Sequence, residues 1–177
     1  MVIKERVGER LQKTRRIAYL GLMLALALLA GYLERLVPPP VPALPGIKLG
    51  LANTVILAVL YLFDTKQALL LNLLRILLSA LLFSGVWGAL YALSGAFFSF
   101  FVMVLLKKSL VFGIVGVSVA GGSFHNLGQI CFAAIIMENR SLFYYLPVLL
   151  VSGLLAGIFV GCISGLCINR LRAGKIV

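Results

Sequence analysis

Long uncharged apolar stretches, separated by short polar or charged segments, dominate the chain. There are six of them, of which the second is short: residues 17–33, 49–63, 67–83, 86–106, 110–137 and 142–168. A helix needs about 20 apolar residues to cross the hydrocarbon core of a bilayer. The stretches are continuous and lack the ten-residue alternation that is typical of membrane β-barrels. The pattern therefore predicts an all-α polytopic membrane protein with six transmembrane helices.

The composition supports this class. Hydrophobic residues make up 62% of the 177 residues and charged residues 12%, with a mean hydropathy of +1.12. Soluble domains are about half apolar and a quarter charged, so this chain has too little polar surface to form their outer shell. The same numbers exclude disordered chains and small disulfide scaffolds. We expect a single-domain, multi-pass protein of the cell membrane, with the lipid bilayer as its surroundings.

The basic residues are distributed unevenly. The formal net charge is +11, and twelve Lys and Arg fall on one side of the predicted membrane, in segments 4–16, 66, 107–108 and 170–175. Only Arg35, Lys48 and Arg140 fall on the other side. Because Lys and Arg are enriched in cytoplasmic loops, both termini are predicted to be cytoplasmic. This divides the chain into a basic N-terminal segment (1–16), a six-helix transmembrane domain (17–169) and a basic tail (170–177), and no nucleic-acid binding is expected.

Five of the six prolines lie in residues 38–45, between the first and second predicted helices. Proline removes backbone donors and fixes φ, so this segment is predicted to be a stiff extended loop on the outer side. It is either a linker or a lid over an outward-facing pocket.

Two predicted helices carry stripes of small residues. The last has glycines at every fourth position, Gly153, Gly157, Gly161 and Gly165, which predicts a close helix–helix contact. The first has one small face at Ala18, Gly21 and Ala25 and another at Ala27, Ala30 and Gly31. Two such faces indicate contacts in two directions, one internal and one with a different subunit.

Polar residues inside the spans are the candidate binding site. Arg75 lies near the middle of the third span, where a charge costs at least a few kcal/mol, and Asn72 and Ser79 share its face. Because acidic partners are scarce, a ligand contact is favoured over an Arg75 bonded only to carbonyls. The fifth span holds a polar cluster, and the second begins with a further amide close to a lysine: His125, Asn126, Gln129, Asn53 and Lys48. We expect these residues, with Asn72 and Arg75, to line one substrate pocket.

Catalysis has little support in the sequence. The chain has a single Asp, whereas enzymes that transfer prenyl groups use aspartate-rich Mg²⁺ sites, and it lacks a GxxxxGK[ST] phosphate loop. Its three cysteines, Cys131, Cys162 and Cys167, lie in apolar spans with only one His in the chain. They are predicted to be packing residues, because this set fits neither a metal site nor a disulfide framework. We therefore expect no enzymatic activity, metal or cofactor.

The most specific motifs are KLGLAN at 48–53 and HNLGQ at 125–129. With the surrounding spans, over roughly residues 15–170, they resemble the Gx transporter family, which also carries the label heptaprenyl diphosphate synthase component I. In architecture the chain is similar to the substrate-binding S components of energy-coupling factor (ECF) transporters. The resemblance implies an S-component-like bundle that captures a small molecule from the outer side. It also implies a transmembrane T protein and two cytosolic ATPases as partners, with the T protein docking at Ala18, Gly21 and Ala25.

Two functions follow from these considerations. The first is an S component that binds a vitamin-like, flavin-like or prenyl-type molecule. The second is a non-catalytic membrane subunit associated with heptaprenyl diphosphate or menaquinone synthesis, or with flavin-based electron transfer. The first is favoured, because Arg75 and the polar cluster of the fifth span fit a ligand pocket.

Overall fold

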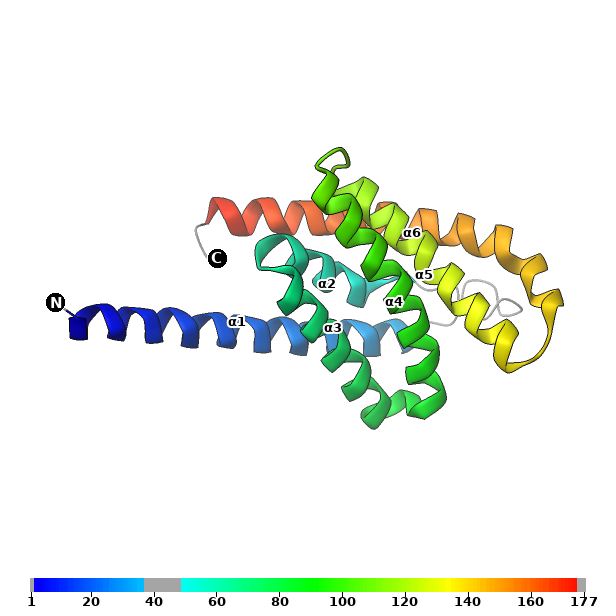
Figure 1. Cartoon of the computed structure of the whole chain (residues 1–177), viewed down its shortest axis with the longest axis horizontal. Coiled ribbons are helices and arrows are strands. Elements are labelled where there is room, and N and C mark those ends of the chain that lie inside the picture. The colour runs from blue at the N-terminus through cyan, green and yellow to red at the C-terminus, as the bar shows by residue number, and fades with distance from the viewer. Residues whose placement is uncertain (1, 37–48, 175–177) are drawn as a thin grey trace.

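The computed structural model describes residues 2–36 and 49–174, and all elements in these ranges are helical (Figure 1). The prediction of an all-α protein is confirmed. The elements are α1 (Val2–Leu36), α2 (Leu51–Leu62), α3 (Thr65–Ser79), a π-helical turn η1 (Ala80–Ser84), α4 (Gly85–Ser109), α5 (Ile114–Ile136), a 3₁₀ turn η2 (Arg140–Tyr145) and α6 (Leu146–Ala173).

The helices differ in their ability to cross a bilayer. Four helical segments of the described chain are long and apolar enough: 10–36, 65–109 (which contains α3, η1 and α4), 114–136 and 140–173. They indicate a membrane protein. In contrast, α2 has 12 residues and a length of about 18 Å, well below the roughly 30 Å of a hydrocarbon core. The count of six membrane spans therefore stays a prediction.

Helix α2 forms the centre of the hydrophobic core. Its residues 56, 57, 59 and 60 are at most 1% exposed, and α2 packs against α1, α3 and α6. An apolar segment that is too short to span a membrane can still bury all its side chains among longer helices. For α2, continuous hydrophobicity marks a core helix.

Helices α5 and α6 pack at backbone distance. A Cβ added to Gly157 would lie 2.6 Å from Val119 Cα, and one added to Gly161 would lie 2.8 Å from Val115 Cα. Gly153 faces α5 in the same way, one turn earlier on α6. Any side chain at these positions would force the helices apart, which agrees with the predicted role of the glycine stripe in membrane helix contacts.

Gly165 departs from this pattern. The sequence predicted a close helix contact for all four glycines and did not identify the neighbouring helix. A Cβ added to Gly165 would meet no described atom within 4 Å, so Gly165 is not part of the α5–α6 contact. The reason is the length of α5. It begins at Ile114, and Gly161 already faces Val115, so the stripe continues one turn beyond the end of its partner helix.

The two small-residue faces of α1 have different surroundings. Ala27 is fully buried, and a Cβ on Gly31 would lie 3.7 Å from Ala52 of α2. Ala18, Gly21 and Ala25 are exposed, and no described atom lies within 4 Å of a Cβ placed on Gly21. The face with Ala18, Gly21 and Ala25 is therefore not covered by the residues that the structure describes, and docking of another subunit there stays a prediction.

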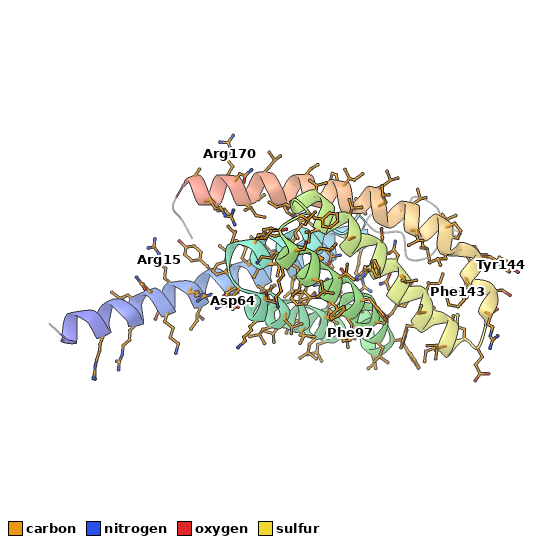
Figure 2. All side chains as sticks on the ribbon, turned by 45° about the horizontal axis from the view of Figure 1, so that its top comes forward. Arg15, Asp64, Phe97, Phe143, Tyr144 and Arg170 are labelled. Carbon is orange, nitrogen blue, oxygen red and sulfur yellow. The ribbon has the colours of Figure 1, made fainter. Side chains whose placement is uncertain are left out.

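Basic side chains gather at one end of the bundle. Arg16 of α1 forms an ion pair with Asp64 at 2.8 Å, while Lys107 and Arg172 donate hydrogen bonds to carbonyls in the last turn of α2. Figure 2 shows the labelled residues at opposite ends: Arg15, Asp64 and Arg170 at one, Phe143 and Tyr144 at the other. These basic residues lie at the same end of the bundle, which agrees with the one-sided distribution of Lys and Arg in the sequence. That this end is cytoplasmic stays a prediction.

The cysteines are not all packing residues. Cys131 is half-buried, whereas Cys162 and Cys167 are exposed on α6. The prediction is wrong for these two, because the described residues leave both side chains exposed.

Candidate ligand cavity

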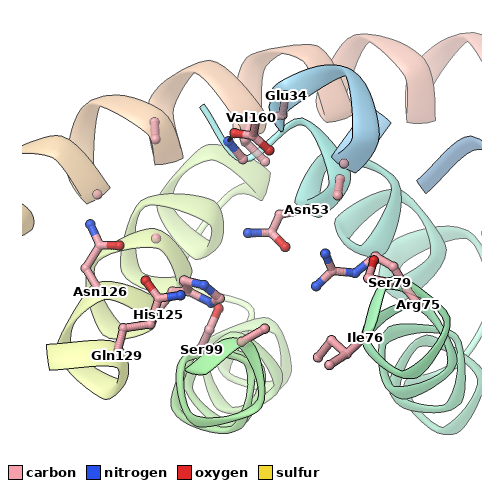
Figure 3. A pocket seen from close by; sticks show the side chains of 18 of the residues that line it. Glu34, Asn53, Arg75, Ile76, Ser79, Ser99, His125, Asn126, Gln129 and Val160 are labelled. Carbon is pink, nitrogen blue, oxygen red and sulfur yellow. Dashed lines mark hydrogen bonds between the residues drawn. The ribbon is translucent and has the colours of Figure 1, made fainter. Parts of the chain in front are cut away.

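A cavity of about 190 Å³ lies between the helices and is lined by residues from all six α-helices and η1 (Figure 3). This volume is many times the roughly 10–15 Å³ that a single water needs. Part of the wall is apolar, with Leu57, Ile76, Met103 and Val160. The rest carries polar and charged side chains from α1, α2, α3 and α5. The cavity can therefore hold a small molecule with both apolar and polar parts.

Arg75 of α3 points into the cavity in Figure 3. Its Nη2 donates a hydrogen bond to Asn72 Oδ1 at 3.1 Å, and its Nε is buried without a hydrogen-bond partner. Helix α3 begins at Thr65, and the preceding residue, Asp64, caps it by accepting a hydrogen bond from the backbone N–H of Gln67 at 2.8 Å. Three turns later the helix presents Arg75 to the space between α2 and α4.

Asn72 has a different position from the one that the sequence predicted. Its side chain is only 5% exposed and does not line the cavity. Residues 72 and 75 share a helix face, so both were expected to meet a ligand. In the structure Asn72 instead accepts a hydrogen bond from Arg75 and restricts the orientation of its guanidinium.

An acidic residue shares the cavity with Arg75. Glu34, near the end of α1, lines the cavity and accepts a hydrogen bond from the backbone N–H of Gly50, the residue that precedes α2. Gly50 has φ +78°, a conformation that glycine adopts at little cost. No ion pair joins Glu34 to Arg75 in the part of the chain that the structure describes. Sequence reasoning missed Glu34 as a site residue, since its distance from Arg75 in the chain gives no sign of their proximity.

The polar residues of α5 divide into two roles. Asn126 donates hydrogen bonds through Nδ2 to Leu149 O at 2.6 Å and to Ser152 Oγ at 3.2 Å, which ties α5 to α6. His125 and Gln129 lie against α4, where a Cβ on Gly95 would come within 2.8 Å of both side chains.

The side-chain amide of Gln129 is open to the cavity. Gln129 is 5% exposed as a residue, its side chain makes no hydrogen bond within the described ranges, and its amide atoms are not among the fully buried atoms that lack a partner. It lines the cavity, as do His125 and Asn126. Its amide is therefore available to a hydrogen-bonding group of a ligand in the cavity.

The rim of the cavity joins α1 to the turn between α3 and α4. Arg35 donates a hydrogen bond from Nη1 to the carbonyl of Phe83, and its guanidinium lies 5.0 Å from the centre of the Phe83 ring. Tyr32 packs on the same ring at a centroid distance of 5.8 Å. Both Arg35 and Phe83 line the cavity. In the sequence, Arg35 served only to predict the orientation of the helices in the membrane, because no feature of the neighbouring residues indicates its contact with η1.

Five of the seven predicted substrate-binding residues line this one cavity: Asn53, Arg75, His125, Asn126 and Gln129. Asn72 lies behind Arg75. Lys48 and the proline-rich segment lie outside the described residues. The ligand-binding roles of all seven residues stay predictions. In the described ranges, no group of three or more His, Cys, Asp or Glu is placed to bind a metal ion.

Comparisons with known proteins identify the family. No curated protein and no solved structure matches the chain. The sequence model of a family described as heptaprenyl diphosphate synthase component I matches residues 23–167, a range that contains every residue of the cavity wall. The match covers most of the chain and confirms the resemblance seen in the sequence. The chain therefore belongs to the heptaprenyl diphosphate synthase component I family.

Proposed function

We propose that this protein is a membrane-embedded substrate-binding subunit, similar to the S component of an ECF transporter. The observation that carries the proposal is the cavity between six helices, which combines an apolar wall with the buried polar groups of Arg75 and Gln129. Such a site fits the capture of a small molecule, and the single Asp of the chain argues against metal-dependent prenyl transfer.

The position of the cavity supports capture from the outer side. Its lining includes the end of α1, the end of α3 and the turn that follows, which lie at the other end of these helices from Arg16 and Asp64. The cavity extends inward as far as Leu57 and Met103. By the positive-inside rule the basic end is cytoplasmic, so the cavity lies toward the exterior. In this orientation segments 1–16 and 170–177 are the cytoplasmic ends of a transmembrane domain at 17–169, which includes α2 as a sixth, buried helix.

The family name supports a partner subunit, because a component belongs to an assembly. For an ECF-type assembly the partners would be a transmembrane T protein and two cytosolic ATPases. The exposed face of α1 with Ala18, Gly21 and Ala25 is the surface that we assign to the T protein.

The test is purification of the full chain in mild detergent, followed by mass spectrometry of any copurified small molecule. We expect one compound in near-stoichiometric amount, and its readdition should raise the Tm of the stripped protein. An Arg75→Ala variant should purify without the compound. If the stripped wild type and Arg75→Ala respond equally to every vitamin, flavin and prenyl compound tried, the proposal is wrong.

A second candidate rests on the family name alone. As a component of a heptaprenyl diphosphate synthase, the chain would be a non-catalytic membrane subunit for prenyl diphosphate or menaquinone synthesis. A non-catalytic membrane subunit for flavin-linked electron transfer is the other form of this candidate. This candidate predicts copurification with a prenyl synthase or a flavoprotein, and neither a T protein nor ATPases in the same complex.

A further inference from the structure

The chemistry of the cavity wall restricts which molecules can occupy it. Two polar positions lie on opposite sides in Figure 3: Arg75 on α3, and Gln129 on α5. Asn53 of α2 lies between them in the same view, and its side-chain amide makes no hydrogen bond within the described chain. Apolar side chains, Leu57, Ile76, Met103 and Val160, form much of the remaining wall. Each polar position sets a requirement for the ligand.

Arg75 requires an oxyanion. A guanidinium has five N–H donors, and the described residues provide an acceptor for only one nitrogen, through Asn72. The Nε donor is buried and has no partner. The carboxylate of Glu34 attracts Arg75 electrostatically but forms no ion pair with it in the described ranges. The remaining donors of the planar guanidinium therefore fit the two oxygens of a carboxylate or phosphate on a ligand.

The charge of the cavity sets the size of that anion. Among the described lining residues, the ionised side chains are Glu34, Arg35 and Arg75, a net charge of about +1. Arg35 already donates to the Phe83 carbonyl, and no metal-binding group of side chains occurs in the described ranges. A monoanion matches this environment. A diphosphate, with about three negative charges, would face one available cation and the carboxylate of Glu34, which is unfavourable at low dielectric.

Gln129 requires a second, uncharged polar group. Its residue is 5% exposed, and its side-chain amide lines the cavity and has no hydrogen bond among the described residues. An isoprenoid chain has no atoms that can donate or accept there. A carbonyl, hydroxyl or ring N–H on the ligand would satisfy it, and a site with a buried polar group rejects analogues that lack the matching group.

We propose that the occupant of this cavity is a small molecule with one oxyanion that binds Arg75, a separate uncharged hydrogen-bonding group that binds Gln129, and an apolar body between them. Prenyl diphosphates lack this pattern and are excluded as ligands. The inference rests on the proposed capture function and specifies its substrate class.

The first experiment needs no knowledge of the ligand. We compare the Tm of the stripped, full-length protein with that of Arg75→Met and Gln129→Met. Arg75→Met removes a guanidinium whose Nε is buried without a partner, and Gln129→Met replaces an amide that has no hydrogen bond in the described ranges with an apolar side chain. Each variant should therefore unfold about 2–4 °C higher. Arg75→Met also leaves Asn72 without its hydrogen bond, which could lower the Tm by itself. The double variant Asn72→Leu/Arg75→Met removes both partners and so controls for this effect. Arg140→Met, at an exposed position outside the cavity wall, is the control and should change the Tm by less than about 1 °C.

The second experiment uses defined probes. At equal ionic strength, sodium acetate should raise the Tm of the wild type above its value in sodium chloride, and this gain should vanish in Arg75→Met. Farnesyl diphosphate should stabilise the wild type no more than farnesol does.

Each outcome decides the inference. If both Arg75→Met and the double variant unfold at a lower temperature than the wild type, and acetate acts on wild type and variant alike, Arg75 is structural and the inference is wrong. A lower Tm for Gln129→Met overturns the second polar requirement. Arg75-dependent stabilisation by farnesyl diphosphate overturns the ligand class but leaves the capture function intact. That function fails separately, if no compound copurifies or binds.

Discussion

Substituting Gly157 by Ala tests the contact on which the geometry of the cavity depends. The added Cβ would lie 2.6 Å from Val119 Cα and 2.9 Å from Ser118 O, whereas ordinary Cβ contacts begin at 3.4 Å. These neighbours belong to the backbone of α5, so no side chain can rotate to make room. The two helices must separate by about 0.8 Å, and the close packing along the whole stripe is disturbed.

The expected cost follows from the same geometry. Overpacking of a tight interior costs about 1–3 kcal/mol, while replacement of Gly by Ala within a helix gains up to about 1 kcal/mol. Gly165→Ala on the same helix isolates the second effect, because no described atom lies within 4 Å of the new Cβ. We therefore expect Gly157→Ala to be less stable than Gly165→Ala by about 1–3 kcal/mol. For a chain of this size each kcal/mol shifts the Tm by roughly 2–4 °C.

The assay is thermal unfolding in detergent, monitored by the fluorescence of Trp87, the single tryptophan of the chain. Gly157→Ala should unfold below the wild type, and Gly165→Ala should unfold at or slightly above it. Equal Tm values for the two variants would refute the reasoning, since the structural difference between the two positions would then have no energetic consequence.

Two further substitutions probe the cavity and the basic end. In Gly95→Ala the new Cβ would come within 2.8 Å of His125 and Gln129, so both side chains must shift. We expect mass spectrometry to detect less copurified ligand with this variant than with Gly165→Ala. An unchanged amount of ligand would contradict the assignment of His125 and Gln129 to the site. At the basic end, Arg16→Ala removes an ion pair whose side chains are 47% and 50% exposed, so the loss in stability should be below about 1 kcal/mol. Asp64→Ala also removes the cap of α3, worth about 0.5–2 kcal/mol, and should lower the Tm further than Arg16→Ala; the reverse order would show that the cap is unimportant.

The sequence determined the elements of this protein well. Each of the six apolar stretches corresponds to one α-helix, because the hydrophobicity of a helix and its charged ends are local properties of the chain. The glycines of α6 were also informative, since a four-residue repeat places them on one face whatever their neighbour is. The polar residues within apolar stretches identified five residues of the cavity wall, because groups that are costly in lipid must face protein or a ligand.

Only the tertiary structure decided which of these groups meet. It brings Glu34 into the cavity of Arg75, places Asn72 behind that arginine, and leaves Gly165 beyond the end of α5. Each of these results depends on where one helix ends relative to another that is distant in sequence. Periodicity fixes the face on which a residue lies, but it holds no information about the length or the relative shift of the helix opposite. The pairing of side chains is therefore a property of the packed bundle and not of any single segment.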